Sequence, residues 1–205
     1  MPKFSGTALV LKAITDVIGS SVLLILLGLP MLLIAFVIRR GSPGPALFKQ
    51  ERVGLDGRTF LCWKFRTMYV DADARRDELR AAHGDDGATF KMADDPRITR
   101  IGRFLRRFSL DELPQLINVW RGDMSLVGPR PHPRDDVERY DDLAVRRLRA
   151  RPGMTGLWQV RGRSDLSWEE SVRLDLYYVE NWSLSMDFVI LASTVSAVVG
   201  GRGAY

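Results

Sequence analysis

The feature that most constrains this chain is an uncharged apolar stretch near its N-terminus, residues 17–38, VIGSSVLLILLGLPMLLIAFVI. At about 1.5 Å per residue, a helix of this length can cross a bilayer core of roughly 30 Å. The stretch is too long for a signal peptide, and the sequence after it, RRGSPGP, contains no small-x-small cleavage site. It also lacks the polar stripe of a helix in a small soluble protein. The sequence therefore predicts a helix that is inserted in a membrane.

The residues around and inside this stretch bear on how it enters the membrane. Lys3 and Lys12 precede it, and Arg39 and Arg40 follow it. Because Lys and Arg are enriched on cytoplasmic flanks, positive charge at both ends favours a segment with both ends on one side. Pro30 lies inside the stretch and removes one helical hydrogen bond, so it predicts a bend. We expect a re-entrant helix-break-helix over residues 1–40, and a kinked single span remains the alternative.

The rest of the chain, residues 41–205, has the composition of one globular domain. Hydrophobic residues make up 46% of the chain and the formal charge is +5, which excludes a disordered or acidic-tail protein. The lone cysteine, Cys62, excludes an internal disulfide framework. The chain has no HExxH motif, no Walker loop and no recognised nucleic-acid motif. Zinc hydrolysis, P-loop chemistry and nucleic-acid binding are therefore not indicated.

Local patterns predict a mostly helical α/β domain with a small β-hairpin and amphipathic interfacial helices. Asp56-Gly57 supplies the hairpin turn, and Lys64 lies on the second strand. Ser167 and Glu170 have capping-box spacing and open a helix. Asp175 falls on the apolar stripe of that helix, so it needs a partner. The apolar helix predicted at 184–199 is too short to span; it either lies in the membrane interface or packs into the core.

Two adjacent carboxylates, Asp111 and Glu112, lie among arginines in the stretch RRFSLDELPQLINVWRGDMSLVGPRP. Ser109 and Glu112 also have the spacing of a capping box, which gives Glu112 a purely structural alternative. An ionised carboxylate can ligate Mg²⁺ or attack phosphorus to form an acyl-phosphate. Attack on a diphosphate also requires cations, and Arg106 and Arg130 are suitably placed in the sequence. The stretch predicts phosphoryl-transfer chemistry.

Several ordered motifs resemble those of the monotopic phosphoglycosyl transferases, also called bacterial sugar transferases. The motifs are KFRTM, DPRITRIGRFLRRFSLDELPQLINVWRGDMSLVGPRP, RPGMTGLWQVRGR and LDLYYVENWSL, and the resemblance runs from about residue 12 to Tyr205. It implies transfer of a sugar-1-phosphate from a nucleotide diphosphate-sugar, with uridine the expected base, to polyprenyl phosphate. The products are polyprenyl-diphosphate-sugar and a nucleoside monophosphate, in the first step of surface glycan synthesis.

The same resemblance assigns roles to individual residues. Asp111 is implied to be the nucleophile that carries the phosphosugar and helps to hold Mg²⁺, and Glu112 its acid/base or orienting neighbour. The family's other functional positions match four phosphate-contacting cations and one supporting acid: Lys64, Arg106, Arg130, Arg163 and Asp175. The family's Ser-Pro break is Leu29-Pro30 in this chain, which leaves the bend supported by Pro30 alone.

The resemblance implies a bacterial inner membrane protein whose catalytic domain, residues 41–205, lies on the cytoplasmic face. Its partners would be the nucleotide-sugar, polyprenyl phosphate and membrane lipids, with no nucleic acid. Two alternatives use similar residues: a membrane-bound nucleotide-sugar pyrophosphatase, and a non-enzymatic membrane adaptor. The sequence identifies neither the sugar nor the oligomeric state.

Overall fold

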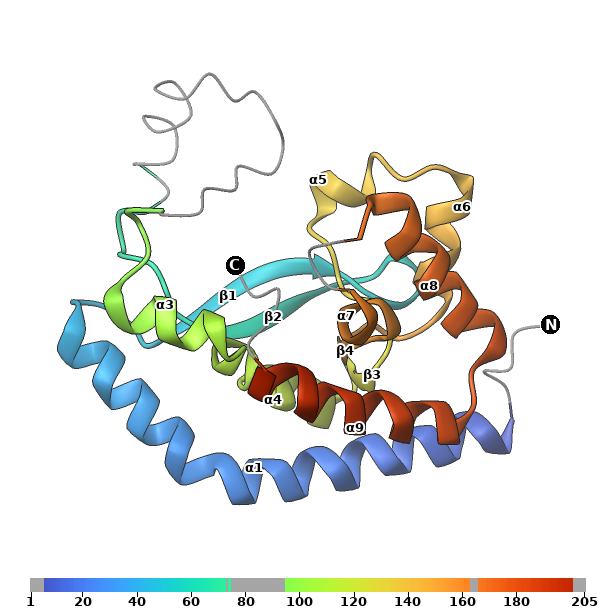
Figure 1. Ribbon diagram of the computed structural model, residues 1–205, viewed down its shortest axis with the longest axis horizontal. Coiled ribbons are helices and arrows are strands. Elements are labelled where there is room, and N and C mark those ends of the chain that lie inside the picture. Colours follow the sequence, from blue (N-terminus) through green and yellow to red (C-terminus); the bar gives the residue numbers. More distant parts are fainter. Residues whose placement is uncertain (1–5, 73, 75–94, 163–165, 201–205) are drawn as a thin grey trace.

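The structure is a computed structural model that describes residues 6–72, 74, 95–162 and 166–200 (Figure 1). Most of the described residues are helical, as predicted. The elements that position the site are α1 (Thr7–Gly41), β1 (Leu47–Val53), β2 (Thr59–Phe65), α3 (Arg100–Arg107), the 3₁₀ turn η2 (Leu110–Glu112), α4 (Gln115–Arg121), β3 (Ser125–Val127) and β4 (Gly153–Thr155). The other elements are η1 (Leu55–Gly57), α5 (Arg134–Val137), α6 (Asp142–Val145), η3 (Arg146–Arg149), α7 (Leu157–Arg161), α8 (Trp168–Asn181) and α9 (Leu184–Gly200).

The apolar stretch forms part of α1, which extends ten residues further towards the N-terminus than the uncharged segment itself. The helix is continuous through Pro30, so the predicted helix-break-helix is present only as a bend, visible in Figure 1. Proline lacks the N–H that would bond to the carbonyl four residues earlier, which weakens the helix at this point. By length and composition, α1 is the one helix among the described residues that is able to cross a membrane.

Both ends of α1 contact the same domain. Near the N-terminal end, Lys12 is 5% exposed and its Nζ lies 2.7 Å from Asp187 Oδ2 on α9. Near the C-terminal end, Ile38 is buried with Phe65 and Leu105. Lys12 is therefore part of a buried ion pair rather than a free charge that flanks the membrane segment.

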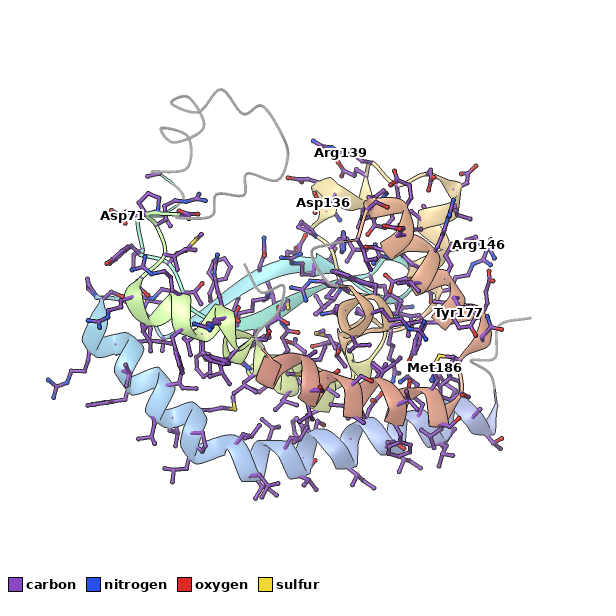
Figure 2. The ribbon with its side chains drawn as sticks, in the orientation of Figure 1. Asp71, Asp136, Arg139, Arg146, Tyr177 and Met186 are labelled. Atoms are coloured by element: carbon purple, nitrogen blue, oxygen red, sulfur yellow. The ribbon has the colours of Figure 1, made fainter. Side chains whose placement is uncertain are left out.

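The middle of α1 leaves a wide apolar surface uncovered. Its most exposed large side chain is Ile25, at 80%, and Leu26, Leu29 and Leu32 are also exposed. Figure 2 shows side chains of α1 projecting away from the rest of the protein along this edge. A large uncovered apolar surface in a folded protein marks an interaction with a membrane or another protein.

The predicted hairpin is confirmed, with its turn where Asp56-Gly57 places it. β1 and β2 pair antiparallel, and both turn residues have positive φ, 53° for Asp56 and 79° for Gly57. A second pair, β3 with β4, is parallel and was not predicted. These strands contain three residues each, so their sequence pattern is too short to be recognised.

The helix predicted at 184–199 is present as α9, and part of it packs into the core as one of the two alternatives expected. Ile190 is buried in the core and Asp187 is buried against Lys12, whereas Phe188, Val189 and Val195 are exposed. One side of α9 therefore packs into the protein and the other is uncovered, beside α1 in Figure 1.

Candidate active site

The acid pair lies in a tight turn between α3 and α4. Ser109 adopts the left-handed conformation at φ 53°, which is uncommon for a residue other than glycine and reverses the chain after α3. Leu110 and Leu113 then pack against the apolar cluster around Leu105. Because these leucines face inward, the intervening Asp111 and Glu112 are directed to the other side of the turn.

The capping box that was the structural alternative for Ser109 and Glu112 is not formed. Ser109 makes no side-chain cap, and the Glu112 carboxylate bonds to cations from distant segments instead. The capping box of Ser167 and Glu170 is confirmed, with both of its reciprocal hydrogen bonds formed.

Glu112 is clamped between two cations. Lys64 Nζ and Arg130 Nη2 each donate to Oε1 at 2.7 Å, and Arg130 Nη1 lies 3.4 Å from Oε2. Burial by itself raises the pKa of Glu112, but Arg130 and Lys64 outweigh burial and hold the pKa well below its usual range. Glu112 is therefore ionised at neutral pH, and its oxygens are already engaged.

Asp111 differs from Glu112 in its contacts. Within the described ranges, no hydrogen bond or ion pair to its carboxylate is found. Burial and the neighbouring Glu112 charge raise the pKa of Asp111 to about 6, against the lowering effect of Lys64, Arg106 and Arg130. A carboxylate that is close to cations but not bonded to them is free to attack an electrophile or to ligate a metal.

Arg106 is held beside Asp111 by the close packing of α3 on the end of the hairpin. Its Nε donates to Thr67 Oγ1 at 3.0 Å. Gly102, one turn earlier, lies so close to Thr67 that a Cβ would be 2.0 Å from the Thr67 carbonyl oxygen. Any larger residue at position 102 would push α3, and Arg106 with it, away from the site.

The segment that carries Arg130 is held by hydrogen bonds to the carbonyls of the residues before and after it. The Pro129 carbonyl accepts from Gly153 N at 2.8 Å, which ties the segment to β4. The Pro131 carbonyl accepts from Arg52 Nη1 at 3.2 Å, which ties it to β1. Pro129 and Pro131 also restrict the backbone around Arg130, so its guanidinium is presented from a rigid segment.

The structure thus brings five of the predicted site residues into one place: Lys64, Arg106, Asp111, Glu112 and Arg130. Asp175 has a partner as predicted, but that partner is Arg147 rather than a member of this cluster. Pro30 lies within α1. Arg163 lies outside the described residues.

Arg147 and Asp175 belong to a separate group of side chains, beside His132, Tyr140 and Trp168. The three aromatic rings lie within 6.0 Å of one another, and the Arg147 guanidinium lies 5.5 Å from the Trp168 ring. Burial and nearby arginines lower the pKa of His132 to about 3, so this imidazole is neutral. The group braces the segment after Arg130, because His132 also bonds to β1 through its carbonyl.

The residue that the sequence interpretation missed is Arg52. Besides holding Pro131, it donates from Nη2 to Gln50 Oε1 at 2.6 Å. The register of the hairpin is the signal that could have identified it. Arg52 pairs with Phe60, and alternate residues of a strand share a face, so Arg52 lies on the same face of the hairpin as Lys64.

The residues present are compatible with Mg²⁺ held jointly with a substrate. No cluster of three His, Cys, Asp or Glu side chains able to hold a metal occurs in the described part of the chain. Asp111 nevertheless offers hard carboxylate oxygens that no described side chain occupies. Since Mg²⁺ is commonly bound by one or two carboxylates plus substrate phosphates, these oxygens suit a shared ion.

Comparison with known proteins extends over nearly the whole chain. The sequence profile of a family described as "Bacterial sugar transferase" matches residues 7–201. The exopolysaccharide production protein ExoY of Rhizobium meliloti is 45% identical over 194 residues, 93% of this chain and 86% of that protein. The galactosyl transferase CpsE of Streptococcus agalactiae is 44% identical over 205 residues, and the chain spans 45% of its length. A Caulobacter vibrioides UDP-glucose:undecaprenyl-phosphate glucose-1-phosphate transferase is 44% identical over 203 residues, 95% of this chain and 72% of that protein.

Proposed function

Because the chain belongs to the bacterial sugar transferase family and is therefore an enzyme, we propose that it transfers a sugar-1-phosphate from a uridine diphosphate-sugar to polyprenyl phosphate. This reaction would begin the assembly of a surface glycan. The relatives' printed names support both substrates, since one names a UDP-sugar donor and undecaprenyl phosphate as acceptor.

The observation that carries the proposal is that two adjacent carboxylates, Asp111 and Glu112, differ in their contacts. Glu112 is bound by Lys64 and Arg130, whereas Asp111 is unbonded among the described residues and close to the same cations. We assign the nucleophile to Asp111 and the orienting role to Glu112, which holds Lys64 and Arg130 where a diphosphate would lie.

The reaction proceeds in two displacements at one phosphorus. An Asp111 oxygen attacks the phosphorus that carries the sugar, and the bond from that phosphorus to the bridging oxygen breaks. The bridging oxygen leaves with the bonding electron pair on the nucleoside monophosphate. An oxygen of polyprenyl phosphate then attacks the same phosphorus, which expels the Asp111 carboxylate and forms the lipid diphosphate-sugar.

Positive charge around Asp111 lowers the cost of bringing an anionic nucleophile to an anionic substrate. Lys64, Arg106 and Arg130 approach the acid pair from β2, α3 and the segment after β3. Fixed cations of this kind stabilise the charge that develops in phosphoryl transfer. Bound Mg²⁺ would neutralise further charge on the diphosphate.

We also propose that α1 enters the membrane from the cytoplasmic face, bends and returns. The support is that Lys12 and Ile38, near opposite ends of α1, are both buried against the domain that carries Asp111. If α1 were straight and crossed the bilayer, its two ends would lie about 50 Å apart on opposite sides of the membrane. An acceptor headgroup at the membrane surface would then lie on the same side as the nucleotide-sugar.

The identity of the sugar is left open. Relatives named for galactose and for glucose have the same 44% identity to this chain. A screen of uridine diphosphate-sugars for release of uridine monophosphate would identify the donor.

The deciding experiment incubates purified protein with Mg²⁺, a nucleotide-sugar and polyprenyl phosphate. Nucleoside monophosphate release that depends on the lipid supports the transferase, release without lipid indicates the pyrophosphatase, and no release indicates the adaptor. Asp111→Asn should abolish turnover, and Glu112→Gln should impair it. Asp135→Asn, at an exposed position on α5, is the matched control. Turnover at the wild-type rate in Asp111→Asn would exclude the proposed nucleophile.

A further inference from the structure

Arg52 is a partly buried cation close to the acid pair that the mechanism above does not use. Its guanidinium contacts two neutral acceptors, the Pro131 carbonyl at 3.2 Å and Gln50 Oε1 at 2.6 Å. Within the described residues no carboxylate lies within salt-bridge distance of it. Buried guanidinium groups are normally paired with an anion, so Arg52 has unused capacity for one.

Arg130 is the main charged neighbour of Arg52. Burial and this like charge lower the pKa of Arg52, and the smaller opposite effects of Cys62, Asp136 and Glu112 only partly offset them. Figure 2 places Asp136 on α5, above the hairpin that carries Arg52. The four cations Lys64, Arg106, Arg130 and Arg52 outnumber the three nearby carboxylates Asp111, Glu112 and Asp136. The remaining positive charge favours an anionic substrate such as a diphosphate ester.

The hairpin register gives Arg52 its place along the diphosphate. Lys64 and Arg52 lie on one side of the ladder, separated by the Gln50–Cys62 pair. Lys64 contacts Glu112 directly, whereas Arg52 contacts Pro131, the residue after Arg130. Lys64 and Arg52 thus lie at two separate points beside Arg130, which suits contact with two different phosphates.

We propose that Arg52 binds the phosphate of the departing nucleoside monophosphate. The proposal rests on the proposed transferase function. When the bond to the bridging oxygen breaks, that oxygen keeps the electron pair and the departing monophosphate gains one negative charge. The Arg52 guanidinium, released from Gln50, donates to this phosphate and stabilises the leaving group. Arg52 therefore acts on the leaving group in the first displacement. In the second, polyprenyl phosphate attacks opposite Asp111, from the side that the nucleotide has left, so its phosphate takes the same place beside Arg52.

The test measures the two half-reactions separately, together with the affinity for uridine monophosphate, in protein reconstituted in nanodiscs. Arg52→Met should weaken binding of uridine monophosphate by about 10- to 100-fold, the loss expected for a hydrogen bond to a charged group. It should slow both formation of the Asp111 phosphosugar and transfer from that intermediate to polyprenyl phosphate by similar factors. Arg58→Met, at an exposed position on the same hairpin, is the control and should change neither step.

Two results would overturn the assignment. Wild-type affinity for uridine monophosphate in Arg52→Met would show that Arg52 does not touch the leaving group. A loss confined to one half-reaction would show that Arg52 does not lie where the leaving and attacking phosphates both bind. If Arg52→Met fails to fold, Arg52→Lys keeps the charge and should show a smaller loss that again affects both half-reactions. A wild-type protein that forms no intermediate and releases no nucleotide would instead refute the proposed function itself.

Discussion

Replacing Asp111 with asparagine should make the folded protein more stable as well as inactive. Burial and the adjacent Glu112 raise the pKa of Asp111 from 3.8 to about 6. The folded state therefore holds this proton more tightly than the unfolded state does. As pH rises above about 4, the unfolded chain loses the proton first, and the stability of the folded state falls until the pH passes about 6.

The size of the effect follows from the shift. A shift of about two units corresponds to about 3 kcal/mol, at roughly 1.4 kcal/mol per unit, once both states are ionised. Asp111→Asn removes this cost, so we expect it to stabilise the protein by up to about 3 kcal/mol at pH 8 and by almost nothing at pH 4. For a chain of this size such a gain corresponds to a rise in melting temperature of about 6–12 °C.

Thermal unfolding in detergent at several pH values between 4 and 8 would measure the difference between Asp111→Asn and wild type. Asp135→Asn, at an exposed position, should show no such dependence on pH. Two results would refute the idea that ionisation of Asp111 destabilises the folded protein. One is a difference in stability between Asp111→Asn and wild type that does not change with pH. The other is an Asp111→Asn protein that is less stable than wild type at pH 8. The expected gain in stability with loss of activity is typical of a residue retained for chemistry.

Four other predictions concern the site, the core and the membrane helix. Formation of the phosphosugar intermediate should speed up as pH rises through about 6, because Asp111 attacks only when ionised; a rate independent of pH between 5 and 7 would contradict this. Excess EDTA should stop turnover and Mg²⁺ should restore it, whereas full activity in chelator would exclude a metal role. Asp175→Asn should destabilise the protein by about 3–5 kcal/mol in denaturant titrations, because it leaves Arg147 buried without its counter-ion. Cysteines introduced at Lys3 and Gly41, with Cys62 replaced, should both be protected from an impermeant reagent in intact cells; labelling at position 3 alone would mean that α1 spans.

Features that depend on a few neighbouring residues were predictable from the sequence. The apolar composition of residues 17–38 predicts α1, and Asp56-Gly57 predicts the hairpin turn. Ser167 and Glu170 predict the start of α8. These predictions succeeded because each rests on hydrogen bonds or apolar contacts within one or two turns of the chain. The local capping pattern does not hold at Ser109. The backbone of Ser109 is left-handed, and Glu112 forms an ion pair with a cation that is distant in the sequence.

What the sequence determined by itself is the apolar membrane-type helix, the hairpin and the presence of an acid pair among cations. Only the tertiary structure decided which cations reach which acid. Glu112 is 48 residues from Lys64 and 18 from Arg130, and the packing of β2 and the segment after β3 around η2 brings them together. Tertiary packing also separated the two acids into a clamped Glu112 and an unbonded Asp111, and placed Arg52 beside Arg130. Burial and charge depend on neighbours in space, so a pattern of residues along the chain is unable to specify them.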